Sequence, residues 1–353
     1  QIAQVSTGAD GTAKIEGIAA GKSCFFRELQ PAHEDYQKNE RDYPVQIVAG
    51  QTAWANRGQP VVNEWKRGAL RIYKTDGRTG QPLSGVRFGI FTDAAATKQC
   101  GEVVTDANGE AIFGMENGKF VLRCRQLLYV KELASKDATW VVSETVYPVQ
   151  ILGETIVDIN GGAAVENYQK YWQLTVYKLD AHNGGICAGD AKVAGAVYGL
   201  YNSEDRLLET CTVDSAGCFR TKAYVAGTGY YLKELEAPVG YQKDEARHEL
   251  DAYTAPLQLT KPLTEAELTL TEKAVEGQVS LIKFKESEGS QKDPEAGAEF
   301  VIYRKAESSY ETAAAGDEER VYDACTVNEN GVAVWSGGET VSKKLVYGIY
   351  ILH

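Results

Sequence analysis

Short runs in which apolar and polar residues alternate recur along the whole chain, as in LRIYK from Leu70, LTVYK from Leu174 and VSLIK from Val279. These runs are rich in β-branched and aromatic residues, and turn-forming clusters such as TDANGE and VDSAGC separate them. Helical periodicity is scarce, because the best candidate, residues 307–319, has no apolar stripe and is typical of a solvated insert. The pattern predicts an all-β chain built from antiparallel sandwiches.

Four features recur in one order, which indicates an internal repeat. The first is a strand that ends in lysine, at Lys74, Lys178 and Lys283. The second is a glycine-containing turn, at Gly11, Gly109, Gly217 and Gly331. The third is a strand that ends in glutamate, at Glu28, Glu132 and Glu234. The fourth is a closing strand that ends in asparagine, at Asn63 and Asn167, whereas the third repeat has Glu272 at this position.

The order of these features divides the chain into four parts. Residues 1–66 correspond to the second part of a repeat, residues 67–171 and 172–276 to two complete repeats, and residues 277–353 to the first part of another. Counted along the chain, residues 67–171 are the second repeat and residues 172–276 the third. The sequence therefore predicts a segment of a longer tandem array. Because the chain begins inside this pattern, the lack of a signal peptide at its start has no bearing on export.

Strand alternation places a charged residue in each predicted core. Lys74 shares a strand face with Leu70 and Ile72, and the recurring glutamate and asparagine also share faces with apolar residues. An isolated buried charge costs several kcal/mol or shifts its pKa until it is neutral. One interpretation is a buried Lys–Glu ion pair with a hydrogen-bonding asparagine. The other is chemical: a neutral lysine attacks the carboxamide, a glutamate with a raised pKa transfers protons, and ammonia leaves to give an amide bond.

At these residues the chain resembles the collagen-adhesin B-type and SpaA-type pilin repeats of Gram-positive surface proteins. The motifs that carry the resemblance are YKTD and YKLD, then GVRFGIF, GAVYGLY and GAEFVIY, then TDANG, and then YYLKELEAPVGY. Together they span essentially the whole chain. The resemblance implies tandem prealbumin-like (Ig-like) β-sandwich domains in a rod-like array, a self-generated intramolecular isopeptide bond, and a structural role as an adhesin stalk or pilin.

The resemblance also assigns roles to single residues. It implies that Lys74, Glu132 and Asn167 form one complete cross-linking triad, with Glu132 as the catalyst of the bond. Glu28 and Asn63 would be the remainder of another triad, and Lys283 would begin a further one.

The third repeat departs from the pattern. Lys178 and Glu234 are in place, but Glu272 stands where asparagine is expected, and a carboxylate has no good leaving group until it is protonated. We therefore expect an ion-paired cluster without a cross-link in this repeat.

Composition excludes several other functions. The 49 acidic and 37 basic residues give a net charge of −12 without long blocks, so neither nucleic acid nor an anionic membrane surface is an expected partner. No apolar run is long enough to span a membrane. The four histidines are scattered, the seven cysteines lack a metal-binding spacing, and recognised catalytic motifs do not occur. We expect no cofactor, no metal and no turnover enzyme.

Two smaller signals leave alternatives open. Cys211 and Cys218 flank a turn and are candidates for a disulfide across it, whereas Cys24 is expected to be a packed thiol. An odd number of cysteines in an exported array leaves at least one thiol free. The stretch YQKN around Lys38 is similar to a sortase lysine motif of pilins, but YQKD occupies the same place in the third repeat, which favours a simple turn.

The expected function is a stalk or pilin segment of an extracellular, cell-wall-attached protein, whose partners are the neighbouring repeats of the same chain. The alternative is an adhesin module whose loops bind a host matrix protein or a polysaccharide. For that alternative the segments to examine are residues 123–129 and 307–320. A contiguous exposed aromatic patch would favour binding, and polar faces would favour a stalk.

Overall fold

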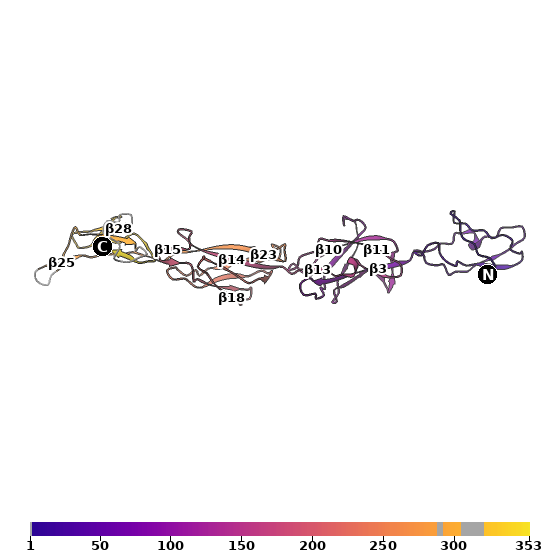
Figure 1. Cartoon of the computed structure of the whole chain (residues 1–353), viewed down its shortest axis with the longest axis horizontal. Coiled ribbons are helices and arrows are strands. Elements are labelled where there is room, and N and C mark those ends of the chain that lie inside the picture. The colour runs from indigo at the N-terminus through magenta and orange to yellow at the C-terminus, as the bar shows by residue number, and fades with distance from the viewer. Residues whose placement is uncertain (1, 288–291, 305–320) are drawn as a thin grey trace. The chain divides into compact units, whose positions relative to one another are not determined.

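The computed structural model describes residues 2–287, 292–304 and 321–353 (Figure 1). The helix candidate and insert at residues 307–320 lie outside the described residues. The chain divides into two compact units, Gln1–Asp137 with Val142–Tyr168, and Ala138–Val141 with Gln169–His353. Helices in the described residues are limited to α1 (Asp251–Thr254) and two 3-10 turns, η1 (Ala55–Gly58) and η2 (Ile159–Gly162). The expectation of an all-β chain is confirmed.

In the first unit, residues up to 66 form one antiparallel pair, β1 (Ser23–Phe26) with β2 (Tyr43–Gln46). Residues 67–168 form two larger sheets. One has the order β11 (Val146–Gln150), β10 (Leu127–Ala134), β4 (Arg87–Phe91) and β5 (Gln99–Val104). A hairpin of β7 (Met115–Glu116) and β8 (Lys119–Phe120) lies outside these sheets.

The second of these sheets is built around β3 (Arg67–Asp76), the strand that ends near Lys74. It pairs in parallel with β12 (Ile156–Asp158) and β13 (Val165–Asn167), and antiparallel with β6 (Glu110–Phe113) and β9 (Leu122–Arg123). The first and last strands of the repeat are thus neighbours. The register aligns Val165 with Lys74 and Asn167 with Asp76, so Asn167 lies two positions beyond the lysine.

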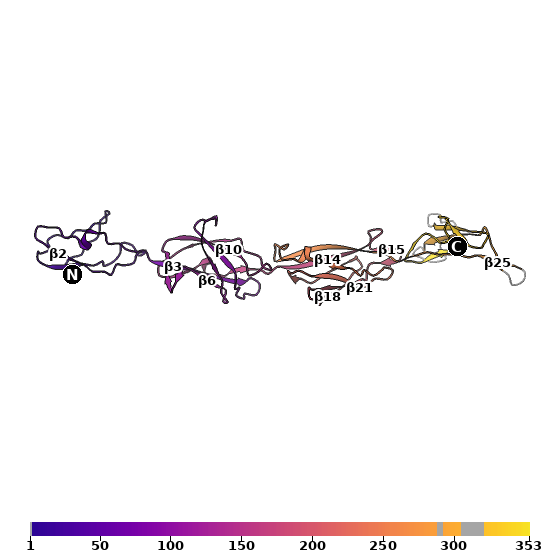
Figure 2. The ribbon, with the colours of Figure 1, turned by 180° about the vertical axis from the view of Figure 1, so that it is seen from behind.

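In the second unit, residues 171–272 repeat this arrangement (Figure 2). The first strand β14 (Tyr171–Asp180) and the last strand β23 (Leu263–Glu272) run parallel over their full length, and β19 (Cys218–Arg220) and β20 (Tyr224–Val225) pair with β14 on its other edge. The opposite sheet has the order β18 (Leu207–Thr212), β17 (Val197–Tyr201), β21 (Tyr231–Glu236) and β22 (Arg247–Glu249). A short hairpin joins β15 (Cys187–Ala188) to β16 (Ala191–Lys192).

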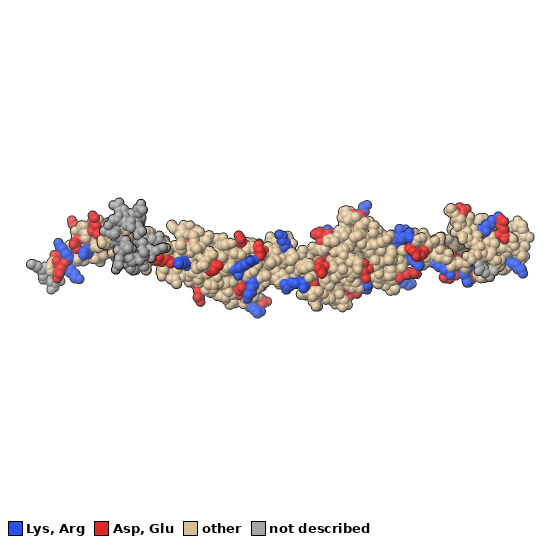
Figure 3. Space-filling view, viewed as in Figure 1, with Lys and Arg blue, Asp and Glu red and all other residues tan. Residues whose placement is uncertain are grey.

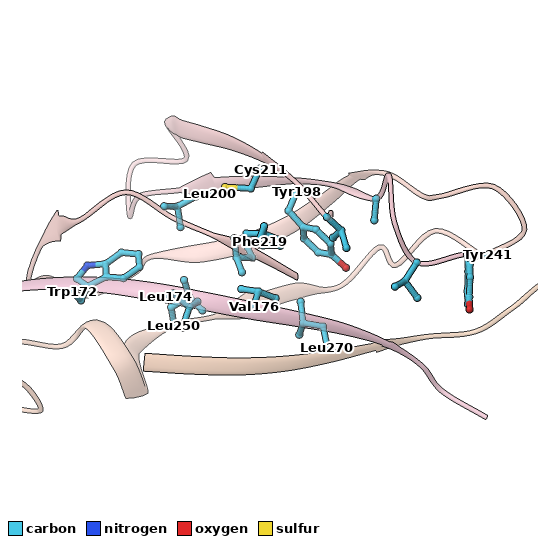
Figure 4. Close-up of a cluster of buried hydrophobic side chains, with 14 of the residues drawn as sticks. Trp172, Leu174, Val176, Tyr198, Leu200, Cys211, Phe219, Tyr241, Leu250 and Leu270 are labelled. Carbon is cyan, nitrogen blue, oxygen red and sulfur yellow. The ribbon is translucent and has the colours of Figure 1, made fainter. Parts of the chain in front are cut away.

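The core of this repeat follows from strand alternation. Every second residue of β14 is buried, so Trp172, Leu174 and Val176 face inward, where they meet Tyr198 and Leu200 from β17 (Figure 4). Lys178 continues the same inward series and is fully buried. The predicted sandwich, with its lysine strand facing the core, is what the structure contains.

Residues 276–353 form a further set of strands. The main sheet has the order β29 (Ala333–Trp335), β28 (Val321–Val327), β27 (Glu299–Arg304) and β31 (Tyr350–Leu352). Two short pairs accompany it, β24 (Glu276–Gly277) with β30 (Leu345–Val346) and β25 (Phe284–Glu286) with β26 (Lys292–Pro294). Ile302, Ala333 and Trp335 are buried in its core.

On the face drawn in Figure 3, acidic and basic side chains are interspersed. This matches the absence of long charge blocks in the sequence. No helix within the described residues is long and apolar enough to cross a membrane.

Candidate intramolecular cross-link site

A glycine turn holds each lysine strand in place. The amide nitrogen of Lys74 donates to the carbonyl of Gly109 at 2.8 Å, and Lys178 donates in the same way to Gly217 at 2.7 Å. Gly109 has a φ of +70°, and a Cβ on it would lie 2.3 Å from the Lys74 carbonyl oxygen. Only glycine fits such a left-handed residue so close to another backbone. The recurring turn glycine of the sequence therefore fixes the position of the lysine strand.

The structure brings Lys74, Glu132 and Asn167 together in the core of the second repeat. Lys74 Nζ lies 3.7 Å from Glu132 Oε2, and both side chains are fully buried. Asn167 Nδ2 donates to Glu132 Oε1 at 2.5 Å, and Asn167 is also buried. Glu132 thus lies between the amine and the carboxamide, with one oxygen towards each.

Further contacts orient these three side chains. Lys74 Nζ donates to the carbonyl oxygen of Val165 at 2.9 Å, which holds the amine against the closing strand. Asn167 Nδ2 also donates to Ser135 Oγ at 2.9 Å, and the Ser143 amide donates to Glu132 Oε2 at 3.4 Å. Asn167 Oδ1 is buried and accepts no hydrogen bond within the described part of the chain. The side-chain carbonyl of Asn167 therefore accepts no hydrogen bond from a described residue.

Burial perturbs both ionisable groups in the direction that amide formation needs. Desolvation lowers the pKa of Lys74 to about 8, partly offset by the charge of Glu132, so the nucleophilic neutral amine is far more accessible than in a free lysine. Desolvation also raises the pKa of Glu132, against the opposing effects of Asn167 and Lys74. An amine and a carboxyl with converging pKa values exchange a proton at little cost.

This arrangement can form an amide bond with balanced chemistry. Neutral Lys74 Nζ attacks Asn167 Cγ, and Glu132 Oε2 takes the proton that the nitrogen loses. The C–Nδ2 bond then breaks, and a proton delivered through Glu132 Oε1 makes the leaving group ammonia. No oxidant or cofactor is required. In this scheme Glu132 returns to its starting protonation state, so it would act as a catalyst within its own domain.

Residues 1–66 hold the same glutamate–asparagine pair. Asn63 Nδ2 donates to Glu28 Oε1 at 2.5 Å, and the Asn39 amide donates to Glu28 Oε2 at 2.6 Å. Both Glu28 and Asn63 are only partly buried. The contacts of Glu132 with an asparagine side chain and a backbone amide are therefore reproduced around Glu28.

Lys283 is placed differently. Its amide donates to Gly331 at 2.8 Å, as in the other repeats. Its side chain is 42% exposed and pairs with Glu295 at 3.5 Å. Neither a glutamate-ending strand nor a closing asparagine faces it among the described residues. Lys283 lies just before β25 (Phe284–Glu286) and outside any strand, so neither the predicted lysine strand nor a triad is formed around it among the described residues.

The third repeat has a different set of partners for its lysine. Lys178 Nζ lies 3.1 Å from Glu272 Oε2 and 3.6 Å from Glu234 Oε1, with all three side chains essentially inaccessible to solvent. Lys178 also donates to the hydroxyl of Tyr198. The structure thus joins Lys178, Glu234 and Glu272 in an ion-paired cluster.

Tyr198 is a site residue that sequence reasoning did not single out. It pairs in register with Glu234, and the corresponding residue opposite Glu132 in the second repeat is Phe88. The signal was present in the sequence, since GVRFGIF and GAVYGLY differ at this position. A buried phenol needs a polar partner, and the structure places the Lys178 amine within hydrogen-bonding distance of it.

The remaining candidates make simple contacts in the structure. All seven cysteines are free thiols, so Cys211 and Cys218 are not joined across their turn. Lys38 pairs with Glu40 at 3.1 Å, and Lys243 pairs with Glu245 at 3.3 Å in the matching turn of the third repeat. Within the described residues, no cluster of histidine, cysteine or acidic side chains is suited to hold a metal ion.

Comparison with known families identifies the repeats. Residues 68–155 and 173–255 each match the model of the SpaA family, a prealbumin-like fold domain. The chain carries two SpaA-type domains. This confirms the expected family and the prealbumin-like fold of the two complete repeats. No curated protein matches the chain.

Solved structures are similar to the chain at low sequence identity. The Bacillus anthracis TIE protein is 20% identical with a TM-score of 0.56, and the match covers 90% of this chain and 48% of that one. The chain therefore spans about half the length of that protein. The minor pilin of Streptococcus agalactiae is 16% identical over 59% of this chain and 96% of its own, with a TM-score of 0.24. The shaft pilin of Lactobacillus rhamnosus GG is 15% identical over 60% and 98%, also with a TM-score of 0.24.

Proposed function

We propose that the chain is a structural segment of a Gram-positive surface protein, either a stalk or a pilin, and that it is displayed outside the cell and attached to the wall. In this role its SpaA-type repeats space a distal part of the protein from the surface and resist force, and the partners of each repeat are its neighbours in the chain. The two matched SpaA-type domains support this role.

In the proposed function the second repeat is locked by an amide between Lys74 and Asn167 that Glu132 catalyses. The observation that carries this proposal is the fully buried contact of Glu132 with both Lys74 Nζ and Asn167 Nδ2. A buried amine beside a carboxamide, with a proton carrier between them, is the arrangement that amide formation requires. The site acts once per domain, so the chain is not a turnover enzyme.

The distribution of exposed aromatic residues favours a stalk over a binding module. The large exposed aromatic side chains of the described residues are spread over all four parts of the chain: Phe25, Trp54, Tyr168, Tyr177, Phe284 and Tyr347. A ligand-binding surface on one repeat would instead gather such residues into one patch.

The cross-link can be tested by weighing the intact chain. We expect the purified chain to be lighter than its sequence by at least one ammonia, and a peptide map to join the Lys74 peptide to the Asn167 peptide. Glu132→Gln should restore the sequence mass in this repeat, since a carboxamide cannot carry the proton. The matched control is Glu144→Gln, because Glu144 is 81% exposed and pairs with Lys131 outside the core. A wild-type chain without a joined Lys74–Asn167 peptide would restore the ion-pair interpretation.

A further inference from the structure

The core of the third repeat holds two carboxyl groups around one amine. Lys178 Nζ is 3.1 Å from Glu272 and 3.6 Å from Glu234, and the three side chains are 0–1% exposed. The second repeat has only one carboxyl group at the equivalent site, because its closing strand ends in Asn167. The additional carboxyl group is therefore a property of the third repeat.

A charge count shows that the cluster is not balanced when fully ionised. One ammonium and two carboxylates leave a net charge of −1 in a core from which water is excluded, and such an unpaired buried charge is strongly unfavourable. Among the described residues, no ion pair other than that of Lys178 brings a cation to Glu234 or Glu272. Asp180, buried beside Glu272 in the β14–β23 register, adds further negative charge. Burial raises the pKa of Tyr198 above its usual value, so its phenol stays neutral.

The charged groups on the outer side of the cluster pair with each other. The Asp244 amide donates to Glu234 Oε2 at 2.7 Å, and the Asp244 carboxylate pairs with His248 at 2.9 Å. The buried phenol of Tyr241 lies close to the Asp180 carboxyl group. The His248 imidazole is therefore occupied by Asp244 and does not neutralise the Glu234–Glu272 pair.

The hydrogen bonds of the cluster point to the same imbalance. Glu234 Oε1 and Glu272 Oε1 are buried and accept no hydrogen bond from any described residue, and Glu272 Oε2 faces the Lys178 ammonium at 3.1 Å. Buried carboxylate oxygens are normally satisfied by donors. A proton held between Glu234 and Glu272 would provide the missing donor and would also remove the excess negative charge.

We propose that the third repeat binds one proton in its core, shared between Glu234 and Glu272 opposite Lys178, and that this proton fastens β14, β21 and β23 together. The repeat is then held by a neutral set of one ammonium, one carboxylate and one carboxylic acid, in place of a covalent bond. This inference does not rest on an amide in the second repeat.

The proton makes the third repeat more stable in acid than at alkaline pH. Burial, reinforced by Glu234, raises the pKa of Glu272 from its ordinary 4.5 to about 8 in the folded state. Folding therefore takes up a proton between these two values. The stabilisation is fully present below pH 4.5 and is lost as the pH rises through 8. The folded state of the third repeat would therefore be more stable in an acidified environment than in an alkaline one.

Hydrogen exchange of the full-length chain tests this proposal repeat by repeat. Mass spectrometry would follow peptides from β14 and β23 between pH 5 and pH 8.5, with rates corrected for the intrinsic pH dependence of exchange. One linked proton changes an equilibrium up to tenfold per pH unit. We expect the protection factors of these peptides to fall by at least about tenfold across this range.

Two variants assign the effect. Glu272→Gln supplies a permanent N–H donor to Glu234, so its protection should hardly change with pH. The control is Glu265→Gln on the same strand, where Glu265 is 64% exposed and should leave the wild-type slope intact. The His248–Asp244 pair is unaltered in both variants, so any proton linkage there cancels in the comparison. If Glu272→Gln does not fold, the test rests on the pH dependence of the wild-type protection factors. Flat wild-type protection, or an equal slope in Glu272→Gln, would overturn the proposal.

Discussion

Lys74 and Lys178 occupy the same position on equivalent strands, and the fold satisfies their buried amines in different ways. Lys74 meets one carboxyl group, the Val165 carbonyl and a carboxamide, whereas Lys178 meets two carboxyl groups and the Tyr198 hydroxyl. Two substitutions distinguish the sites, Asn167 against Glu272 and Phe88 against Tyr198. In the proposed function the first site forms an amide, and the second is an ion-paired cluster.

Removing the amine of the third repeat tests how much the ion cluster depends on it. Lys178→Met keeps most of the side-chain volume but leaves two carboxyl groups without a cation. Breaking a buried pair in this way costs about 3–5 kcal/mol. We expect the urea midpoint of the third repeat, followed by hydrogen exchange of its peptides, to fall accordingly. The exposed Lys222 provides the control, since Lys222→Met should change the midpoint little.

The third repeat should acquire a cross-link when its departures from the pattern are reversed. Glu272→Asn places a carboxamide next to Glu234, in the position that Asn167 has next to Glu132, and Tyr198→Phe removes the hydroxyl that holds Lys178. We expect the double variant to lose one more ammonia than the wild-type chain, with the Lys178 peptide joined to the residue 272 peptide. An unchanged mass would mean that other contacts of the second repeat, such as the Ser135 hydroxyl on Asn167, are also required.

Strand periodicity predicted the inward lysines and glutamates of the second and third repeats, and Asn167, because a period of two residues assigns every side chain to a face. It was wrong for Lys283, whose side chain is 42% exposed. It could not predict Ser135, Tyr198 or the Val165 carbonyl as their partners. These contacts depend on how two sheets stack and on strand register, and neither is encoded in the alternation of a single strand. In the third repeat, the presence of Glu272 in place of asparagine was sufficient to predict an ion-paired cluster.

At the scale of elements, the glycine turn and the lysine strand form one unit. The turn is closed by a carboxylate or carboxamide side chain, since Asp106 Oδ1 accepts from the amides of Asn108 and Glu110, and Asn328 Oδ1 does the same for Asn330 and Val332. The glycine carbonyl then receives the lysine amide. A weak turn should therefore disturb the reactive site as well as the fold.

Gly109→Ala tests this link. The substitution strains a left-handed residue and drives a Cβ towards the Lys74 carbonyl oxygen. We expect a loss of about 1–3 kcal/mol in the stability of the second repeat, together with slower release of ammonia when the newly made chain first folds. Gly118→Ala is the matched control, because Gly118 has a similar φ of +75° but open space around its Cβ position. If both variants behave alike, backbone strain alone explains the effect and the contact with Lys74 contributes nothing.

The closing strand shows where element boundaries escape sequence analysis. In the second repeat it is interrupted between β12 and β13 by η2, where Asn160 and Gly161 adopt left-handed conformations. In the third repeat the same element is one continuous strand, β23, of ten residues. The run Asn160-Gly161-Gly162 favours such a break, but only the pairing with β3 on both sides shows that the two pieces continue one element.

At the scale of the whole molecule, the consequence of the proposed amide is mechanical. In a tandem chain, force enters a repeat through its first strand and leaves through its last, and the amide would join β3 to β13 directly. It also closes nearly the whole repeat into a loop, which by the loop-entropy estimate for disulfides stabilises the fold by about 4–5 kcal/mol. The third repeat has only non-covalent contacts between its first and last strands in this proposal.

Pulling single full-length chains from their two ends distinguishes these repeats. In the wild-type chain the stretch between Lys74 and Asn167 should never extend, because tension passes through the amide, whereas the third repeat should unfold and lengthen. Glu132→Gln should release the second repeat and add a new extension of about 300 Å, the length of that stretch when stretched out. Glu144→Gln should leave the wild-type trace unchanged. Reducing agents should have no effect on any trace, because an amide, unlike a disulfide, is not reduced by thiols. A wild-type chain that already shows the additional extension would contradict the load path proposed for the second repeat.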